Sequence, residues 1–155
     1  FLEIVKKLRQ VCPSMRLSTD AIVGFPGETD DDFKRTKEAF VESGFEMGYI
    51  FKYSERTGTP ATQLENKVAK AIKEKRNQEL LSLLEAQSFA SNQRLVGHSM
   101  EILVEGPARK GDGKLMGRTR CYRKVIFEGS ATLIGSLVDV RIKDVSSSTL
   151  KAIEI

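Results

Sequence analysis

The sequence has few of the residues that hold metals or form disulfides. Its 155 residues include two cysteines, Cys12 and Cys121, and one histidine, His98. The cysteines form neither a C-x-x-C pair nor any other metal-ligand spacing, so we interpret them as unpaired thiols of a reducing cytoplasm. A single histidine that follows a glycine is typical of a surface or turn position. The sequence therefore offers no disulfide framework and no metal-binding motif.

Long apolar runs are also lacking. No stretch approaches the roughly 20 apolar residues that a membrane-spanning helix needs. The composition, 40% hydrophobic and 30% charged, is typical of a water-soluble globular protein. The chain starts at Phe1 inside a helical pattern, with an apolar stripe of Leu2, Val5, Leu8 and Val11, and we expect no signal peptide. We therefore expect a piece of a longer protein, of one domain or two small ones.

The charge is distributed unevenly along the chain. Residues 1–91 carry 14 basic and 14 acidic side chains, whereas residues 92–155 carry 11 basic and 7 acidic ones and so supply the whole net charge of +4. From Arg109 to Lys124 there are seven basic residues and a single acid, Asp112. This last part of the chain is a candidate for binding a polyanion.

The first half alternates strand and helix patterns. Residues 16–25 and 46–54 are rich in β-forming residues, and between them Thr29 and Asp32 resemble a capping box that begins a helix ending at Gly44. Phe33, Lys37, Phe40 and Val41 should share one face of this helix. Strand, helix and strand at this spacing predict a βαβ unit with a right-handed crossover.

The second half changes its period after a long helical pattern. A loop over residues 55–64 precedes residues 68–96, which are one long helix or two short ones, closed by Gly97. Beyond it, five short stretches of alternating pattern, with a flexible loop over Gly106–Lys114, predict a small all-β barrel of the OB type. Such barrels often bind nucleic acid on one face.

The stretch DAIVGFPGETDDDF, residues 20–33, is a candidate ligand site. Sites in α/β folds lie at the carboxyl ends of parallel strands, where the glycines of Gly24–Gly27 would let a ligand approach the backbone. The start of the next helix would offer N–H groups to an anion, and Asp20 could accept hydrogen bonds from a ribose diol. The alternative is a tight β-to-α turn in which Asp20 caps the backbone locally. The residues alone leave both interpretations open.

The stretches STDAIVGFPGETDDDF and FKYSERTGTPA together closely resemble the radical S-adenosylmethionine methylthiotransferases, the MiaB-like tRNA-modifying enzymes. LVGHSMEILVEG, GRTRCYRKVIFEG and LIGSLVDVRI resemble the TRAM domain that ends those proteins. The resemblance covers nearly the whole chain in the expected order. It implies a fragment of a TIM-like (βα) barrel over residues 1–91, including a linking helix, followed by a TRAM domain over residues 92–155.

Within the family, GRTR followed by a Val-Ile-Phe strand looks most like the branch that methylthiolates N6-isopentenyl-adenosine beside the tRNA anticodon. The family often has Asn where this chain has Tyr122 and Arg123 before Lys124. Sister enzymes act on threonylcarbamoyl-adenosine or on a ribosomal protein, and both remain alternatives. A further alternative is a stand-alone RNA-binding module that retains part of the larger barrel.

The resemblance implies S-adenosylmethionine and two [4Fe–4S] clusters in the full-length parent. It assigns the wall of the cofactor pocket to Asp20, Gly24, Phe25, Pro26 and Gly27, with Phe51 on the next strand facing the same pocket. Clusters are held by cysteine thiolates, and Cys12 and Cys121 match neither of the family's ligand sets. We therefore expect this chain alone to be inactive and its cluster ligands to lie in the missing N-terminal part.

The resemblance also implies a cytoplasmic enzyme whose partner is the anticodon stem-loop of tRNA. The expected phosphate contacts in the barrel are Arg118, Arg120, Arg123 and Lys124, with Tyr122 available to stack on a base or sugar. Strand alternation should put Arg118 and Arg120 on one face and Thr119 on the other. A solvated basic face without a partner is the alternative.

Overall fold

The computed structural model describes residues 1–109 and 113–155. It divides into two compact units, Phe1–Gln87 and Ser88–Ile155, each with an apolar core of its own. Part of the predicted loop and basic region, residues 110–112, lies outside the described residues. Within these ranges no helix is both long enough and apolar enough to cross a membrane.

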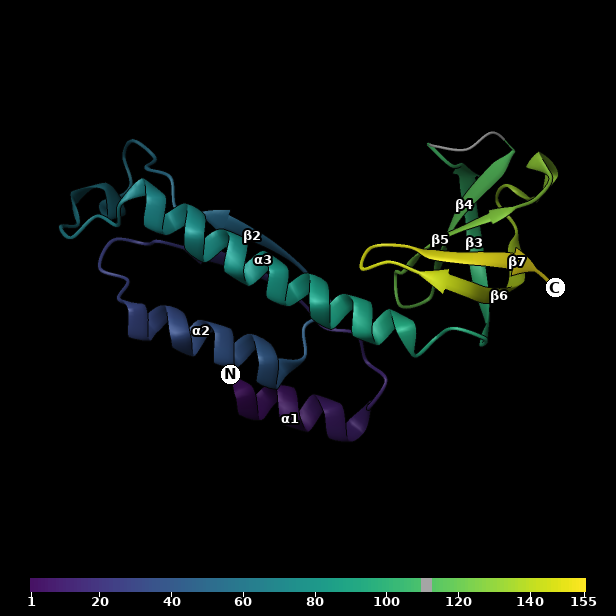
Figure 1. Ribbon diagram of the computed structural model, residues 1–155, viewed down its shortest axis with the longest axis horizontal. Helices are drawn as coiled ribbons and strands as arrows, with labels where there is room; N and C mark the ends of the chain where they lie inside the picture. Colours follow the sequence, from purple (N-terminus) through teal and green to yellow (C-terminus); the bar gives the residue numbers. More distant parts are fainter. Residues whose placement is uncertain (110–112) are drawn as a thin grey trace. The chain divides into compact units, whose positions relative to one another are not determined.

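The first unit is built on the predicted βαβ motif (Figure 1). Strand β1 (Ser18–Val23) pairs in parallel with β2 (Met47–Lys52), and helix α2 (Asp30–Ser43) connects them. Thr29 and Asp32 form the predicted capping box, and Gly44 ends the helix in the left-handed conformation, with φ of 62°. Local sequence signals therefore determined both ends of α2.

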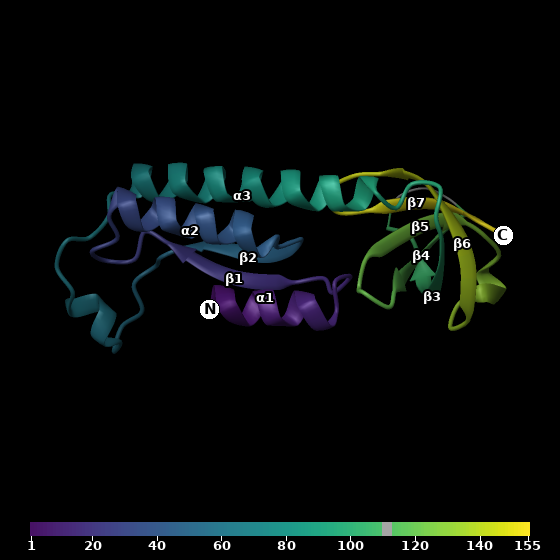
Figure 2. The same cartoon turned by 90° about the horizontal axis from the view of Figure 1, so that it is seen from below.

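Two further helices complete this unit. α1 (Leu2–Val11) precedes β1, and α3 (Lys70–Gln93) follows a loop that contains the short 3-10 turn η1 (Pro60–Gln63). The helical pattern of residues 68–96 is thus one helix. In both views α2 lies between α1 and α3 (Figures 1 and 2). The core of the unit consists of Val23, Phe33, Phe40, Phe45, Leu80 and Leu84.

The predicted face of α2 is buried only in part. Phe33 and Phe40 are buried, whereas Val41 is 59% exposed. Phe45, which follows the helix, packs edge-on against Phe40 with ring centroids 5.1 Å apart and fills the core from the next segment. The apolar stripe of α2 is therefore narrower than the pattern indicates.

The second unit is the predicted five-stranded barrel. Its strands are β3 (Ser99–Pro107), β4 (Lys114–Thr119), β5 (Lys124–Glu128), β6 (Leu137–Val145) and β7 (Leu150–Glu154), with the 3-10 turn η2 (Ala131–Leu133) between β5 and β6. The barrel closes in the order β3-β4-β5-β7-β6, with β5 and β7 parallel and the other pairs antiparallel. This closure is consistent with an OB-like barrel.

The core of the barrel follows the alternation of its strands. Every second residue of β4 and β5, including Leu115, Val125 and Phe127, is buried, while the residues between them face outward. The complete core set is Ile102, Val104, Leu115, Val125, Phe127, Val140, Ile142, Leu150 and Ala152. Period two therefore determines which side chains of each strand can meet a ligand.

Candidate functional site

One face of the β1–β2 sheet carries exposed apolar and aromatic side chains. Asp20 pairs in register with Tyr49, and Ile22 pairs with Phe51. Tyr49, Phe51 and Ile22 are 66%, 53% and 58% exposed, and the two aromatic rings stack with centroids 6.3 Å apart. The opposite face, with Ala21, Val23 and Ile50, packs into the core. The structure thus brings Asp20 and Phe51, two predicted cofactor residues, to the same open face.

The Gly24–Gly27 turn follows the carboxyl end of β1, as expected. Its two glycines differ in the space around their Cα atoms. A Cβ on Gly24 would lie 2.1 Å from Cγ of Lys73, so a side chain of α3 fills the space where a ligand was expected. At Gly27, with φ of 86°, a Cβ would meet nothing within 4 Å. Of these two glycines, Gly27 has open space beside its Cα, while its N–H donates to the Asn66 carbonyl at 3.0 Å. Both glycines adopt the left-handed conformation that other residues rarely take.

The two remaining residues of the turn have different surroundings. Pro26 is buried, whereas Phe25 is 42% exposed. The Phe25 ring stands edge-on to Tyr53, with centroids 5.1 Å apart. Lys73 also reaches Tyr53, since its Nζ donates to the Tyr53 carbonyl at 3.1 Å. Tyr53, in the segment that follows β2, therefore contacts both the turn and Lys73 of α3.

Acidic side chains at and just before the start of α2 already occupy the hydrogen-bonding groups around it. Oε2 of Glu28 accepts the N–H of Gly24 at 2.9 Å, and Arg76 of α3 forms ion pairs with Glu28 at 2.6 Å and with Asp30 at 2.7 Å. The hydrogen bond from Arg76 lowers the pKa of Asp30 below its ordinary value. Another anion would meet these carboxylates, so the structure argues against the predicted anion site.

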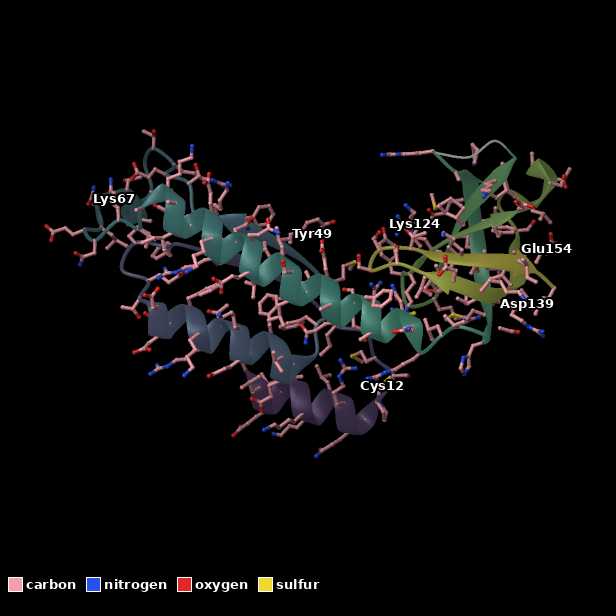
Figure 3. All side chains as sticks on the ribbon, in the orientation of Figure 1. Cys12, Tyr49, Lys67, Lys124, Asp139 and Glu154 are labelled. Atoms are coloured by element: carbon pink, nitrogen blue, oxygen red, sulfur yellow. The ribbon has the colours of Figure 1, made fainter. Side chains whose placement is uncertain are left out.

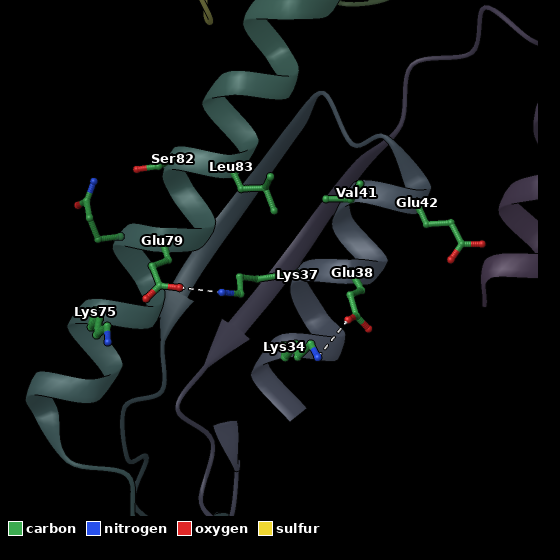
Figure 4. Close-up of a pocket in the computed structure, with 10 residues that line it drawn as sticks. Lys34, Lys37, Glu38, Val41, Glu42, Lys75, Glu79, Ser82 and Leu83 are labelled. Carbon is green, nitrogen blue, oxygen red and sulfur yellow. Dashed lines mark hydrogen bonds and ion pairs between the residues drawn. The ribbon is translucent and has the colours of Figure 1, made fainter. Parts of the chain in front are cut away.

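A separate groove lies between α2 and α3 (Figure 4). It has a volume of about 990 Å³, and Val41 and Leu83 form part of its apolar lining. The Nζ of Lys37 and a carboxylate oxygen of Glu79 form an ion pair across it at 2.9 Å. None of the predicted site residues lines this groove. Val41 is exposed because its side chain lines this groove.

The basic residues of the barrel lie on and beside β4. Arg118 and Arg120 point outward while Thr119 is buried, as the alternation predicted. Each arginine is paired with a glutamate of β3: Nε of Arg118 lies 3.2 Å from Glu105, and Nη2 of Arg120 lies 3.0 Å from Glu101. The charge of the predicted patch is therefore partly neutralised within the barrel.

Two more residues join Arg118. Lys124 is its partner in the β4–β5 register, and Figure 3 labels it on the barrel. The guanidinium of Arg118 lies over the ring of Tyr122, with Cζ 4.1 Å from the ring centroid. Tyr122 is 58% exposed. An exposed aromatic ring with adjacent cations is a common arrangement for nucleic-acid contacts.

Comparison with known proteins shows what the barrel is similar to. Residues 93–153 match the TRAM domain family. We refer to the barrel as the TRAM domain after this match.

Similarity extends beyond the TRAM domain to 97% of this chain. The chain is 49%, 44% and 43% identical to proteins named tRNA-2-methylthio-N(6)-dimethylallyladenosine synthase from Opitutus terrae, Bordetella avium and Desulfitobacterium hafniense, respectively. The alignments cover 31–34% of these relatives, so the chain spans about a third of their length. The chain is thus a homologue of these synthases, which confirms the predicted relationship.

Arg123 lies in a different environment from Arg118, Arg120 and Lys124. It is only 8% exposed, and its guanidinium donates to Oδ1 of Asn92 and, at 3.0 Å, to Oγ of Ser91. Asn92 is 2% exposed and donates in turn to the carbonyls of Ser146, at 2.8 Å, and Ser147, at 3.2 Å. Burial argues against the predicted phosphate contact at Arg123 and indicates an anchor for the end of α3.

The two cysteines do not provide a cluster site. Cys12 follows α1 in the first unit (Figure 3), and Cys121 lies in the turn after β4 of the TRAM domain. Among residues 1–109 and 113–155 no group of three or more His, Cys, Asp or Glu side chains could hold a metal ion. A [4Fe–4S] cluster needs several thiolates at one place, so the described residues do not fit one.

Sequence reasoning missed several residues of both candidate sites. Ile22 and Tyr49 share the open sheet face, and they lie two residues from Asp20 and Phe51, so alternation along each strand would have identified them. Glu101 and Glu105 pair with the arginines from a strand 13 or more positions away. Those contacts depend on register between strands, which no local pattern contains.

Proposed function

We propose that this chain is the C-terminal part of an enzyme that adds a methylthio group to N6-isopentenyl-adenosine next to the tRNA anticodon. The observation that carries the proposal is the continuity of the similarity through both units, over 97% of the chain. A stand-alone RNA-binding module needs similarity in the TRAM domain only. The sister activities, on threonylcarbamoyl-adenosine or a ribosomal protein, are not the ones named for these relatives.

The first unit is best explained as part of a TIM-like (βα) barrel. Its sheet is parallel and packs helices against one face, while the other face leaves Tyr49 and Phe51 open. Helix α1 also exposes apolar side chains, with Ile4 62% and Val11 88% exposed. Further strands and helices from the rest of the same protein would cover these surfaces, so that part is the proposed intramolecular partner.

The open sheet face fits one wall of an S-adenosylmethionine pocket. The aromatic pair and Ile22 offer flat apolar surface for an adenine ring, and Asp20 on the same face offers carboxylate oxygens to a ribose diol. Gly27, in the turn after β1, leaves open space beside its Cα. When bound, S-adenosylmethionine supplies the radical and methyl chemistry. The residues of this chain would position it, and the cluster ligands would come from elsewhere in the full-length protein.

The TRAM domain is proposed to hold the anticodon stem-loop. Arg118, Arg120 and Lys124 supply cations on one outer surface, and Tyr122 supplies an exposed ring beside them. Phosphate contacts of this kind position a protein on RNA without reading its sequence. Because tRNA is the proposed substrate, the cytoplasm is the expected compartment.

Salt-dependent binding tests the tRNA contact. Replacing Arg118, Arg120 and Lys124 together by alanine should weaken binding of tRNA to this chain. It should also flatten the slope of log K against log[salt] by about two to three, because each lost phosphate contact removes roughly 0.7–0.9. Fluorescence anisotropy at four or more salt concentrations measures both quantities, for cognate and non-cognate tRNA alike.

A matched control is the triple replacement of Lys6, Lys34 and Lys70 in the first unit, which removes the same charge elsewhere. This control should leave the slope nearly unchanged. If both triple variants alter the slope equally, net charge alone drives binding. If the chain binds no tRNA at moderate salt, the assignment of the TRAM domain to tRNA is wrong.

A further inference from the structure

Tyr122 adopts a backbone conformation that aromatic residues rarely take. Its φ is 64°, in the left-handed region that glycine and asparagine tolerate best. Two hydrogen bonds to Thr119 hold the turn around Tyr122. The N–H of Tyr122 donates to the carbonyl of Thr119 at 2.9 Å, and the N–H of Arg123 donates to the Thr119 hydroxyl at 3.0 Å. The surrounding structure thus imposes the conformation on Tyr122.

This conformation brings the ring of Tyr122 against Arg118. The Arg118 guanidinium is then held in two directions, by the ring across its face at 4.1 Å and by Glu105 at its Nε, 3.2 Å away. Neither contact uses the edge that carries the two terminal nitrogens. A guanidinium fixed in this way can present that edge to a phosphate at little cost in side-chain entropy.

Apolar side chains continue the same surface. Across four strands the register places Lys124 beside Arg118, Arg118 beside Leu103, and Leu103 beside Leu137. We call Lys124, Arg118, Leu103 and Leu137 the outer row. Leu103 and Leu137 are 45% and 60% exposed. The outer row therefore runs from cationic to apolar, with the exposed ring of Tyr122 beside Arg118.

We infer that the outer row and Tyr122 form a site for one unpaired nucleotide, whose base lies on Tyr122 and Leu103 and whose phosphate meets Arg118 and Lys124. This inference rests on the proposed binding of RNA by the TRAM domain. A paired base in A-form RNA has no free face to stack on a ring, whereas an unpaired base has one. Because Arg118 and Arg120 are also paired with glutamates, their net attraction for phosphate is reduced, and contact with a base would add to the affinity.

The test compares two labelled single-stranded RNA 12-mers with the same phosphates, one of them abasic at its central positions. The complete chain should bind the strand with bases about tenfold more tightly, as expected for one stacked base. Tyr122→Asn should abolish most of this preference, since asparagine tolerates the left-handed backbone while lacking the ring. Tyr122→Phe should retain it, and Leu103→Asn should reduce it severalfold.

Ile153→Asn is the matched control, because it removes an exposed apolar side chain of the barrel outside the outer row. It should leave the preference within about twofold of the unaltered chain. Circular dichroism of each variant verifies folding. A preference that survives in Tyr122→Asn, or equal binding of both strands by the unaltered chain that still binds tRNA, overturns the inference alone. If the unaltered chain binds neither the 12-mers nor tRNA, the proposed function fails with it.

Discussion

At the scale of single residues, identical side chains in one short stretch have opposite environments. Arg118, Arg120 and Arg123 all lie within GRTRCYRK, yet the first two face outward and the third is buried. The alternation of side chains along β4 predicts the outward position of Arg118 and Arg120, because Arg118 lies on that strand and Arg120 directly follows it. Arg123 follows a turn, where period two no longer applies, and its partners come from the end of α3. Its burial was therefore inaccessible to local reasoning.

Replacing Arg123 tests this difference between the arginines. Arg123→Met should lower the free energy of unfolding of the TRAM domain by about 2–4 kcal/mol, because it removes hydrogen bonds from a charged group and leaves the buried side-chain oxygen Oδ1 of Asn92 without that donor. Arg120→Met, at an exposed site, should change it by less than about 0.5 kcal/mol. Urea denaturation followed by circular dichroism measures both. Equal effects would mean that Arg123 is no anchor.

At the scale of elements, the boundaries of α2 and the barrel strands followed from the sequence because their causes are local. A capping box, a terminal glycine and alternating burial each act within a few residues. The environment of the Gly24–Gly27 turn did not follow, because Lys73 and Arg76 reach it from α3, roughly fifty positions along the chain. Both glycines have positive φ, yet only the structure tells the filled position from the open one.

The start of α2 should make the first unit sensitive to acid. The pKa of Asp30 is lowered by a hydrogen bond from Arg76, and that of Asp32 by hydrogen bonds with Thr29. When the folded pKa lies below the unfolded value, near 3.9, the stabilisation is present above that value. It is lost as the pH falls from about 5 through the folded pKa. Helix α2 should therefore lose amide protection progressively below about pH 5.

Hydrogen exchange of α2 amides between pH 3 and 5 measures this loss. In the double variant Asp30→Asn and Asp32→Asn, protection should be lower at pH 5 and should change less with pH, since the titrating groups are gone. Asp31→Asn is the control, because Asp31 shares the first turn but takes part in neither the Arg76 ion pair nor the capping box. A pH profile of the double variant that matches the original chain would contradict the assignment.

At the scale of the whole molecule, the division into two units raises the question of where the second one begins. The change of hydrophobic period predicts a boundary between Ser88 and Gly97, and the domains are drawn at residues 91 and 92 within that range. The second compact unit starts at Ser88, and Ser91 and Asn92 both contact Arg123. We propose that the last turn of α3 stabilises the TRAM domain, although its helical pattern continues that of the preceding segment.

Two fragments test this proposal. Residues 88–155 should unfold cooperatively, whereas residues 95–155 should be about 2–4 kcal/mol less stable, because Arg123 loses its acceptors Asn92 and Ser91 while the carbonyls of Ser146 and Ser147 lose a donor. Arg123→Met should destabilise the longer fragment but have little effect on, or even stabilise, the shorter one. This difference between the fragments isolates the contact from general effects of truncation. Urea titrations of the four proteins measure it. If the two fragments are equally stable, or Arg123→Met costs the same in both, the helix end contributes nothing to the domain.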